Sequence, residues 1–154
     1  SLVTEETDVV IFEIVERNLR NILLQAPKMP AYEVDLSGQS LTCDEMDIVA
    51  VTSVDGTYVD LAGIAQPSDY DSNTNYDIYI RLVSDDATYT FVSFPILEDV
   101  GLCDDPNLAN AAFSLRIDTA TLMPGDYHLC VVMGDGTSYY LSQTQTDVLV
   151  QVAD

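Results

Sequence analysis

Several residue types that catalytic and metal sites require are scarce in this chain of 154 residues. It has no Trp, one His, three Cys and five Lys+Arg. His128 has no second histidine with which to complete a zinc site, and no cysteine–histidine pairing is apparent. No G-x-S-x-G motif and no glycine-rich phosphate loop occurs either. The sequence therefore predicts a protein without catalytic activity of its own.

The shortage of basic residues also limits the partners. Asp+Glu number 26, which gives a formal net charge of −21. The negative electrostatic potential of such a chain repels nucleic acid and anionic membrane surfaces, so neither is expected as a partner. No apolar run approaches the roughly 18 residues that read as a membrane span, so no membrane insertion is expected. Hydrophobic residues still make up 47% of the chain, which predicts a folded domain rather than a disordered acidic tail.

Three cysteines permit at most one disulfide. Cys130 lies within an apolar strand pattern and is predicted to be a small core residue. Cys43 and Cys103 both lie in polar, loop-like stretches. Two arrangements remain open: a bridge between Cys43 and Cys103, or three free thiols.

From residue 31 onward, short runs of alternating polarity are separated by turn residues, without a helical period. This pattern predicts a mostly β fold, an antiparallel two-sheet immunoglobulin-like sandwich spanning residues 31–154. The expected strands are 31–36, 47–54, 57–64, 76–83, 88–94, 113–117, 126–133, 138–142 and 148–152. Asp55-Gly56 predicts a hairpin with a type I′ turn, which requires positive φ at both central residues.

Alternation within these strands predicts which side chains face the core. The expected core consists of Val49, Val51, Leu61, Ile78, Ile80, Phe91, Phe113, Leu115, Ile117, Tyr127, Leu129, Val131, Val148 and Val150.

One motif makes this fold prediction more specific. Leu122-Met123-Pro124-Gly125-Asp126-Tyr127 resembles the Leu-x-Pro-Gly…Tyr entry to the penultimate strands of fibronectin type III and immunoglobulin-like modules. The resemblance implies that Tyr127 buries its ring while its hydroxyl bonds to upstream backbone. A true immunoglobulin domain is excluded, because its disulfide and core Trp are absent.

Residues 1–30 have a different pattern and are treated as an N-terminal appendage. Residues 9–12 are consecutively apolar, as in a buried strand of a parallel sheet, and residues 19–24 continue as a helical apolar stripe. The chain starts at Ser1 without Met, so we expect it to be a piece of a longer protein. Because residues 9–12 are too apolar to face water, we expect a helix over 8–25, docked on one sheet or joining two copies as a homodimer.

Asp8-Val9-Val10, Glu13, Glu16-Arg17 and Leu19 together resemble the closing strand and helix of SGNH-hydrolase-like polysaccharide O-acetyltransferases, the alginate O-acetyltransferase-like cell-surface proteins. The match covers about a dozen residues. It implies a missing upstream catalytic domain and an extracellular or cell-surface location. That family's Ser nucleophile and Asp-x-x-His pair have no counterpart here, so no catalytic role is carried over. The alternative is that residues 5–26 form an ordinary amphipathic helix on the sandwich.

Two groups of residues are candidates for ligand binding. Asp69, Asp71, Asn73, Asn75 and Asp77 present oxygen-bearing side chains at every second position, as a calcium loop would. The stretch departs from an EF-hand, because Thr74 stands where the turn glycine belongs and Ile80 where the bidentate Glu belongs. The alternative is a polar, turn-rich connection.

The second group is aromatic. Tyr70, Tyr139 and Tyr140 lie in or near loops, where they would provide stacking surfaces for sugars. Against this, Trp is absent and tyrosines are common half-buried strand residues.

Three functional hypotheses follow. The first is an accessory sandwich that binds or positions a cell-surface polysaccharide for a missing catalytic domain. The second is a structural spacer or adhesion-type module without its own ligand. The third is a calcium-stabilised interaction domain of a secreted protein; otherwise no cofactor is expected.

Overall fold

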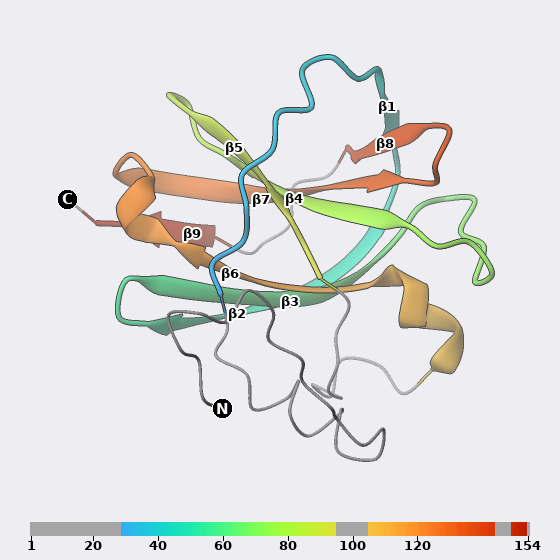
Figure 1. Ribbon diagram of the computed structural model, residues 1–154, viewed down its shortest axis with the longest axis horizontal. Helices are drawn as coiled ribbons and strands as arrows, with labels where there is room; N and C mark the ends of the chain where they lie inside the picture. Colours follow the sequence, from blue (N-terminus) through green and yellow to red (C-terminus); the bar gives the residue numbers. More distant parts are fainter. Residues whose placement is uncertain (1–28, 95–104, 144–148, 154) are drawn as a thin grey trace, which may run out of the picture.

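The computed structural model describes residues 29–94, 105–143 and 149–153. Within them the chain is mostly β and forms two sheets that enclose one core. Figure 1 shows the smaller sheet below and the larger one above. The three-stranded sheet has the order β2-β3-β6, with bounds Asp47–Asp55, Tyr58–Gln66 and Ala112–Asp118.

The larger sheet has the order β1-β8-β7-β4-β5, and β9 also pairs with β7. Its strands are β1 (Leu41–Asp44), β4 (Asp77–Val83), β5 (Thr88–Val92), β7 (Gly125–Gly134), β8 (Tyr139–Ser142) and β9 (Leu149–Val152). Two short 3-10 helices, η1 (Pro106–Ala111) and η2 (Thr119–Thr121), flank β6. The long strand β7 pairs with β9 through its first half and with β8 through its last residues.

The predicted mostly β fold with two sheets is confirmed, with one change in its pairing. Between the strands that the structure describes, the pairings are antiparallel except that of β1 with β8, which is parallel. The sequence analysis does not include β1 among the expected strands, because its four residues lie in a stretch that reads as a polar loop. The fully antiparallel arrangement was therefore wrong at this one edge.

The predicted first strand, 31–36, is instead a strap that joins the two sheets. Ala31 N donates to Arg116 O of β6 at 2.7 Å. Val34 N donates to Thr90 O at 2.8 Å, and Val92 N donates to Tyr32 O at 3.0 Å, both bonds reaching β5. In Figure 1 this blue segment runs from the smaller sheet to the larger one. It shields backbone groups at the edges of both β5 and β6.

Most of the predicted core is confirmed. The buried members are Leu61, Ile78, Ile80, Phe91, Phe113, Leu115, Ile117, Tyr127, Leu129, Val131 and Val150. Val148 lies outside the described residues. The core prediction was wrong for Val49 and Val51, which are 57% and 48% exposed.

The error in β2 concerns which face of the strand points inward. Ala50, rather than its valine neighbours, lies in register with Gly63, which pairs with Phe113 in turn. A Cβ at Gly63 would collide with the Phe113 ring, so this inner row needs small residues beside the phenylalanine. Alternation then places Val49 and Val51 on the outer face.

The hairpin at residue 56 forms as predicted, but with a different turn. Asp55 pairs with Tyr58, so Gly56 and Thr57 are the two central residues. Gly56 has φ 63°, and no described residue other than glycine has positive φ. Positive φ at the first central position alone fits a type II′ turn rather than type I′.

Tyr127 makes the contact that its motif predicted. Its side chain is fully buried, and its hydroxyl donates to Met123 O at 2.7 Å. The cysteine predictions are resolved in part: Cys130 is buried and free, and Cys43 is exposed and free on β1. Cys103 and the predictions for residues 1–28 lie outside the described residues.

Candidate ligand-binding site

A pocket of about 370 Å³ opens where β4 begins and β5 ends. At this point β5 leaves its sheet: Ser93 still bonds to Ile78 O, whereas Phe94 pairs with Ser114 of the other sheet. The side chains at this point thus come from both sheets and from η1. The described lining residues are Asn75, Tyr76, Asp77, Ile78, Tyr79, Val92, Ser93, Phe94, Ala109, Asn110 and Ala112.

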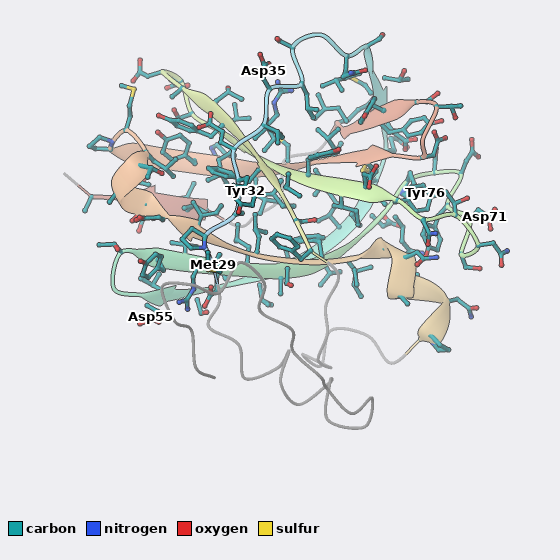
Figure 2. The ribbon with its side chains drawn as sticks, in the orientation of Figure 1. Met29, Tyr32, Asp35, Asp55, Asp71 and Tyr76 are labelled. Carbon is teal, nitrogen blue, oxygen red and sulfur yellow. The ribbon has the colours of Figure 1, made fainter. Side chains whose placement is uncertain are left out.

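One wall of the pocket is the loop that leads into β4. Asp71 Oδ1 accepts from the backbone N of Asn73 at 2.9 Å and from its Nδ2 at 3.1 Å, and Thr74 N donates to Asp71 O at 3.0 Å. These bonds from Asn73, backbone first, lower the pKa of Asp71. Asp71 N in turn donates to the Tyr76 hydroxyl at 3.0 Å. Figure 2 shows Asp71 and Tyr76 together at one end of the molecule.

The other wall is η1, and hydrogen bonds join it to the loop. Asp105 caps η1 by accepting from Asn107 N at 2.9 Å. Tyr70 Oη donates to Asn107 O at 2.7 Å, and Asn110 Nδ2 donates to Ser72 O at 2.8 Å. The two walls are therefore held in place by the protein itself, which makes the pocket preformed.

Aromatic side chains flank the pocket on both sides. The Tyr70 ring stacks on Tyr76, with centroids 5.6 Å apart and planes at 23°. Tyr139 packs against Tyr79 at 6.3 Å. Its ring lies over Gly134, where any Cβ would come within 2.9 Å of the ring. Burial raises the pKa of Tyr70 and Tyr79, so both hydroxyls remain protonated at neutral pH.

The structure separates the three predicted tyrosines. Tyr70 and Tyr139 each support a tyrosine that lines the pocket. Tyr140 faces the opposite side of β8, is half-buried against the core and directs its hydroxyl to Asp135 Oδ2 at 3.4 Å. Consecutive strand residues point to opposite faces, so Tyr139 and Tyr140 do not share a site.

The five predicted calcium ligands are distributed along the same loop. Asn75 and Asp77 line the pocket, while both carboxylate oxygens of Asp71 accept hydrogen bonds within the loop. In the described ranges, no group of three or more His, Cys, Asp or Glu side chains converges as a metal site. Calcium binding through Asp69, Asp71, Asn73, Asn75 and Asp77 remains a prediction.

Sequence reasoning did not identify the residues that complete the pocket. Tyr79 alternates with the expected core residues Ile78 and Ile80, and nothing in the sequence marks it as a binding residue. Asn110 lies 38 residues beyond Ser72, its hydrogen-bond partner, and no motif links them. Only the pairing of sheets and the capping of η1 bring these groups together.

No protein-family model matches this chain, and no curated protein is similar to it. Neither 3-10 helix of the described part has the length and apolar character needed to cross a membrane.

Proposed function

We propose that this chain is a non-catalytic accessory module that binds a neutral glycan in the pocket between β4, β5 and η1. The observation that carries the proposal is the combination of Tyr76 and Tyr79 with Asn75, Ser93 and Asn110 in one preformed pocket. Sugars present apolar C–H faces beside hydroxyl groups. Tyrosine rings match the first, and amide and hydroxyl side chains match the second.

The size and charge of the site support the same ligand class. Small-molecule pockets have volumes of about 300–1,000 Å³, and this one has about 370 Å³. Asp77 is the one charged side chain among the described lining residues, and the chain carries −21 overall. This field disfavours anionic glycans, so an uncharged one is the better match.

The same composition supports a binding role rather than hydrolysis. Glycoside hydrolysis commonly uses two carboxyl groups on either side of the scissile bond. Among the described lining residues, only Asp77 has a carboxyl group. Binding without bond cleavage is therefore the proposed role.

We also propose that the fold is immunoglobulin-like, of the fibronectin type III kind. In immunoglobulin-like domains strands A, B and E share one sheet and strands C, F and G the other. The order β2-β3-β6 fits A, B and E, while β4, β7 and β8 fit C, F and G. The Tyr127–Met123 bond at the start of β7 supports this assignment, because the tyrosine corner occupies that place.

The wider setting rests on the sequence resemblance alone. In an O-acetyltransferase-like parent at the cell surface, such a module would hold polysaccharide near the catalytic domain. The residues that carry this resemblance, 8–19, lie outside the described ranges. A spacer without any ligand is the main alternative, and it predicts that no polysaccharide is bound.

Affinity gel electrophoresis tests the binding proposal. The chain is run through native gels containing neutral or anionic polysaccharides, and its retardation is compared with that in an empty gel. We expect at least one neutral polysaccharide to slow the wild type and Tyr79→Ala to abolish the shift. Tyr32→Ala is the matched control, because Tyr32 is 71% exposed on the strap. Absence of retardation by every polysaccharide would favour the spacer.

A further inference from the structure

The tripeptide Asp-Gly-Thr occurs twice in the sequence, and each copy lies in the turn of a hairpin. Asp55-Gly56-Thr57 leads from β2 into β3, and Asp135-Gly136-Thr137 leads from β7 into β8. Both glycines have positive φ, 63° at Gly56 and 93° at Gly136, and a Cβ added at either would meet no atom beyond its chain neighbours within 4 Å. The two turns therefore share their residues and their open surroundings. They differ in how the aspartate carboxylate is held.

The carboxylate of Asp135 is fixed by its own turn. Its Oδ1 accepts from Ser138 N at 2.7 Å and from both N and Oγ1 of Thr137 at 2.8 Å. These bonds, the one from the Ser138 backbone first, lower the pKa of Asp135 from 3.8 to about 2. A carboxyl group with this pKa is protonated roughly 60-fold less often at pH 7 than one with a pKa of 3.8.

The carboxylate of Asp55 is held by much less. Its side chain is 74% exposed, and it contacts Arg116 Nη2 at 3.2 Å. Arg116 makes its shorter bonds, both of 2.8 Å, to Asp60. Within the described part of the chain, no backbone N–H of the β2–β3 turn donates to Asp55. Figure 2 shows Asp55 at one end of the three-stranded sheet.

An aspartate followed by glycine can isomerise without any other reactant. The glycine nitrogen attacks the aspartate Cγ, a C–N bond forms and a carboxyl oxygen leaves as water, which closes a five-membered succinimide. Water then opens the ring, and where it adds to the main-chain carbonyl the chain continues through Cβ and Cγ as isoaspartate. Glycine favours the attack because it has no side chain beside the nitrogen. An ionised carboxylate must take up a proton before its oxygen can leave, so a carboxylate fixed in the ionised form reacts more slowly.

We propose that Asp55 is a site of spontaneous isomerisation to isoaspartate, through attack by Gly56 N, and that the fold protects Asp135 from the same reaction. The product lengthens the main chain of the two-residue β2–β3 turn by one methylene and replaces the side-chain carboxylate that contacts Arg116. The proposal is independent of the glycan pocket, because none of the described lining residues belongs to β2, β3 or their turn.

Peptide mapping of the full chain after incubation at neutral pH, below its melting transition, tests for this reaction. Trypsin cleavage after Lys28, Arg81 and Arg116 places the two turns on separate peptides, 29–81 and 117–154. Electron-transfer fragmentation then distinguishes isoaspartate from aspartate at each position. We expect isoaspartate to accumulate at Asp55 at least about tenfold faster than at Asp135, because the protonated form of Asp135 is rare. In the urea-unfolded chain the two rates should be equal, since the environments of the two tripeptides are then alike.

Matched variants at the threonines test the origin of the difference. Thr137→Ala removes a hydroxyl that donates to Asp135 at 2.8 Å, so it should raise the rate at Asp135. Thr57→Ala changes the equivalent residue of the other turn and should leave the rate at Asp55 unchanged, because no described bond from the Thr57 side chain reaches that carboxylate. Asp55→Glu keeps a carboxylate but requires a six-membered ring, so the product at this position should disappear.

Three results would overturn the proposal. The first is an absence of isoaspartate at Asp55 in the folded chain, or no more of it than at Asp135. The second is a preference for Asp55 that persists unchanged in urea, which would show that the fold does not cause it. The third is an unchanged rate at Asp135 in Thr137→Ala, which would show that the bonds of this turn do not protect it.

Discussion

At the scale of single residues, Asp135 shows how a side chain fixes a turn. It follows β7, and its Oδ1 accepts from Ser138 N at 2.7 Å and from the N and Oγ1 of Thr137, both at 2.8 Å. These bonds, with the Ser138 backbone first, lower the pKa of Asp135 from 3.8 to about 2. The ionised carboxylate is therefore the form that holds the β7–β8 turn.

This lowered pKa predicts a pH dependence of stability. A carboxylate with a lower pKa in the folded state stabilises that state fully above its unfolded pKa, and the effect is lost as pH falls toward the folded value. We expect Asp135→Asn to lower the urea midpoint at pH 7 and to lower it less at pH 2. Urea titrations of both proteins at the two pH values measure this. An equal shift at both would show that ionisation of Asp135 does not matter.

At the scale of single residues, the sequence identifies only part of the candidate site. Tyr70 and the 69–77 loop could be singled out because oxygen-rich and aromatic residues cluster along the chain. Asn110 and Tyr79 could not, because their role depends on contacts across the fold. Tyr139 and Tyr140 looked equivalent in sequence, and only the strand placement separates them.

At the scale of strands, prediction succeeded wherever polarity alternates. In β4, Asp77, Tyr79 and Arg81 alternate with apolar residues, and every second residue is buried as expected. In β2, residues 48–51 are all apolar, so their pattern does not show which side chains point toward the core. The choice is made by Gly63 and Phe113 on the neighbouring strands, which require the small Ala50 inside.

Truncating a buried strand residue tests which face of the strand points inward. Leu115 of β6 belongs to the core, so Leu115→Ala should lower the free energy of unfolding by about 2–5 kcal/mol through lost transfer energy and a cavity. Val54→Ala, at an exposed position, should change it by less than about 0.5 kcal/mol. Chemical denaturation gives both values. A cost below about 1 kcal/mol for Leu115→Ala would mean that the inward face of β6 is assigned incorrectly.

The strap and β1 show a related limit of sequence reasoning. Tyr32, Val34 and Leu36 alternate with polar residues and favour a strand, but this pattern does not tell which strands the segment pairs with, and the four residues of β1 are too few to mark a strand. Residues 30–34 bond to β6 on one side and β5 on the other, and β1 adds to the edge of β8. Their positions follow from edges that exist only after the two sheets have formed.

At the scale of the whole molecule, net charge opposes folding. The −21 charge gives general self-repulsion, and three of the five Lys+Arg lie in residues 17–28. Salt shortens the Debye length, so any salt should raise the melting temperature smoothly. Thermal melts in sodium chloride provide this baseline.

The calcium hypothesis predicts an effect beyond that baseline. Millimolar calcium should raise the melting temperature more than magnesium or sodium at matched ionic strength, because Ca²⁺ accepts flexible oxygen ligands. Asp71→Ala should remove the difference, and Asp47→Ala, outside the loop, should retain it. Equal effects of calcium and magnesium would contradict a calcium site at residues 69–77.

The central claim is that a neutral glycan binds in the pocket beside Tyr76 and Tyr79. Calorimetric titration of the full chain tests it most directly, with an oligosaccharide from the polysaccharide that retards the chain most. An aromatic contact contributes about 0.5–1.5 kcal/mol beyond area burial. We therefore predict that Tyr79→Ala raises Kd by about tenfold or more, whereas Tyr32→Ala leaves Kd unchanged. An unchanged Kd for a folded Tyr79→Ala protein would contradict the assignment of this pocket.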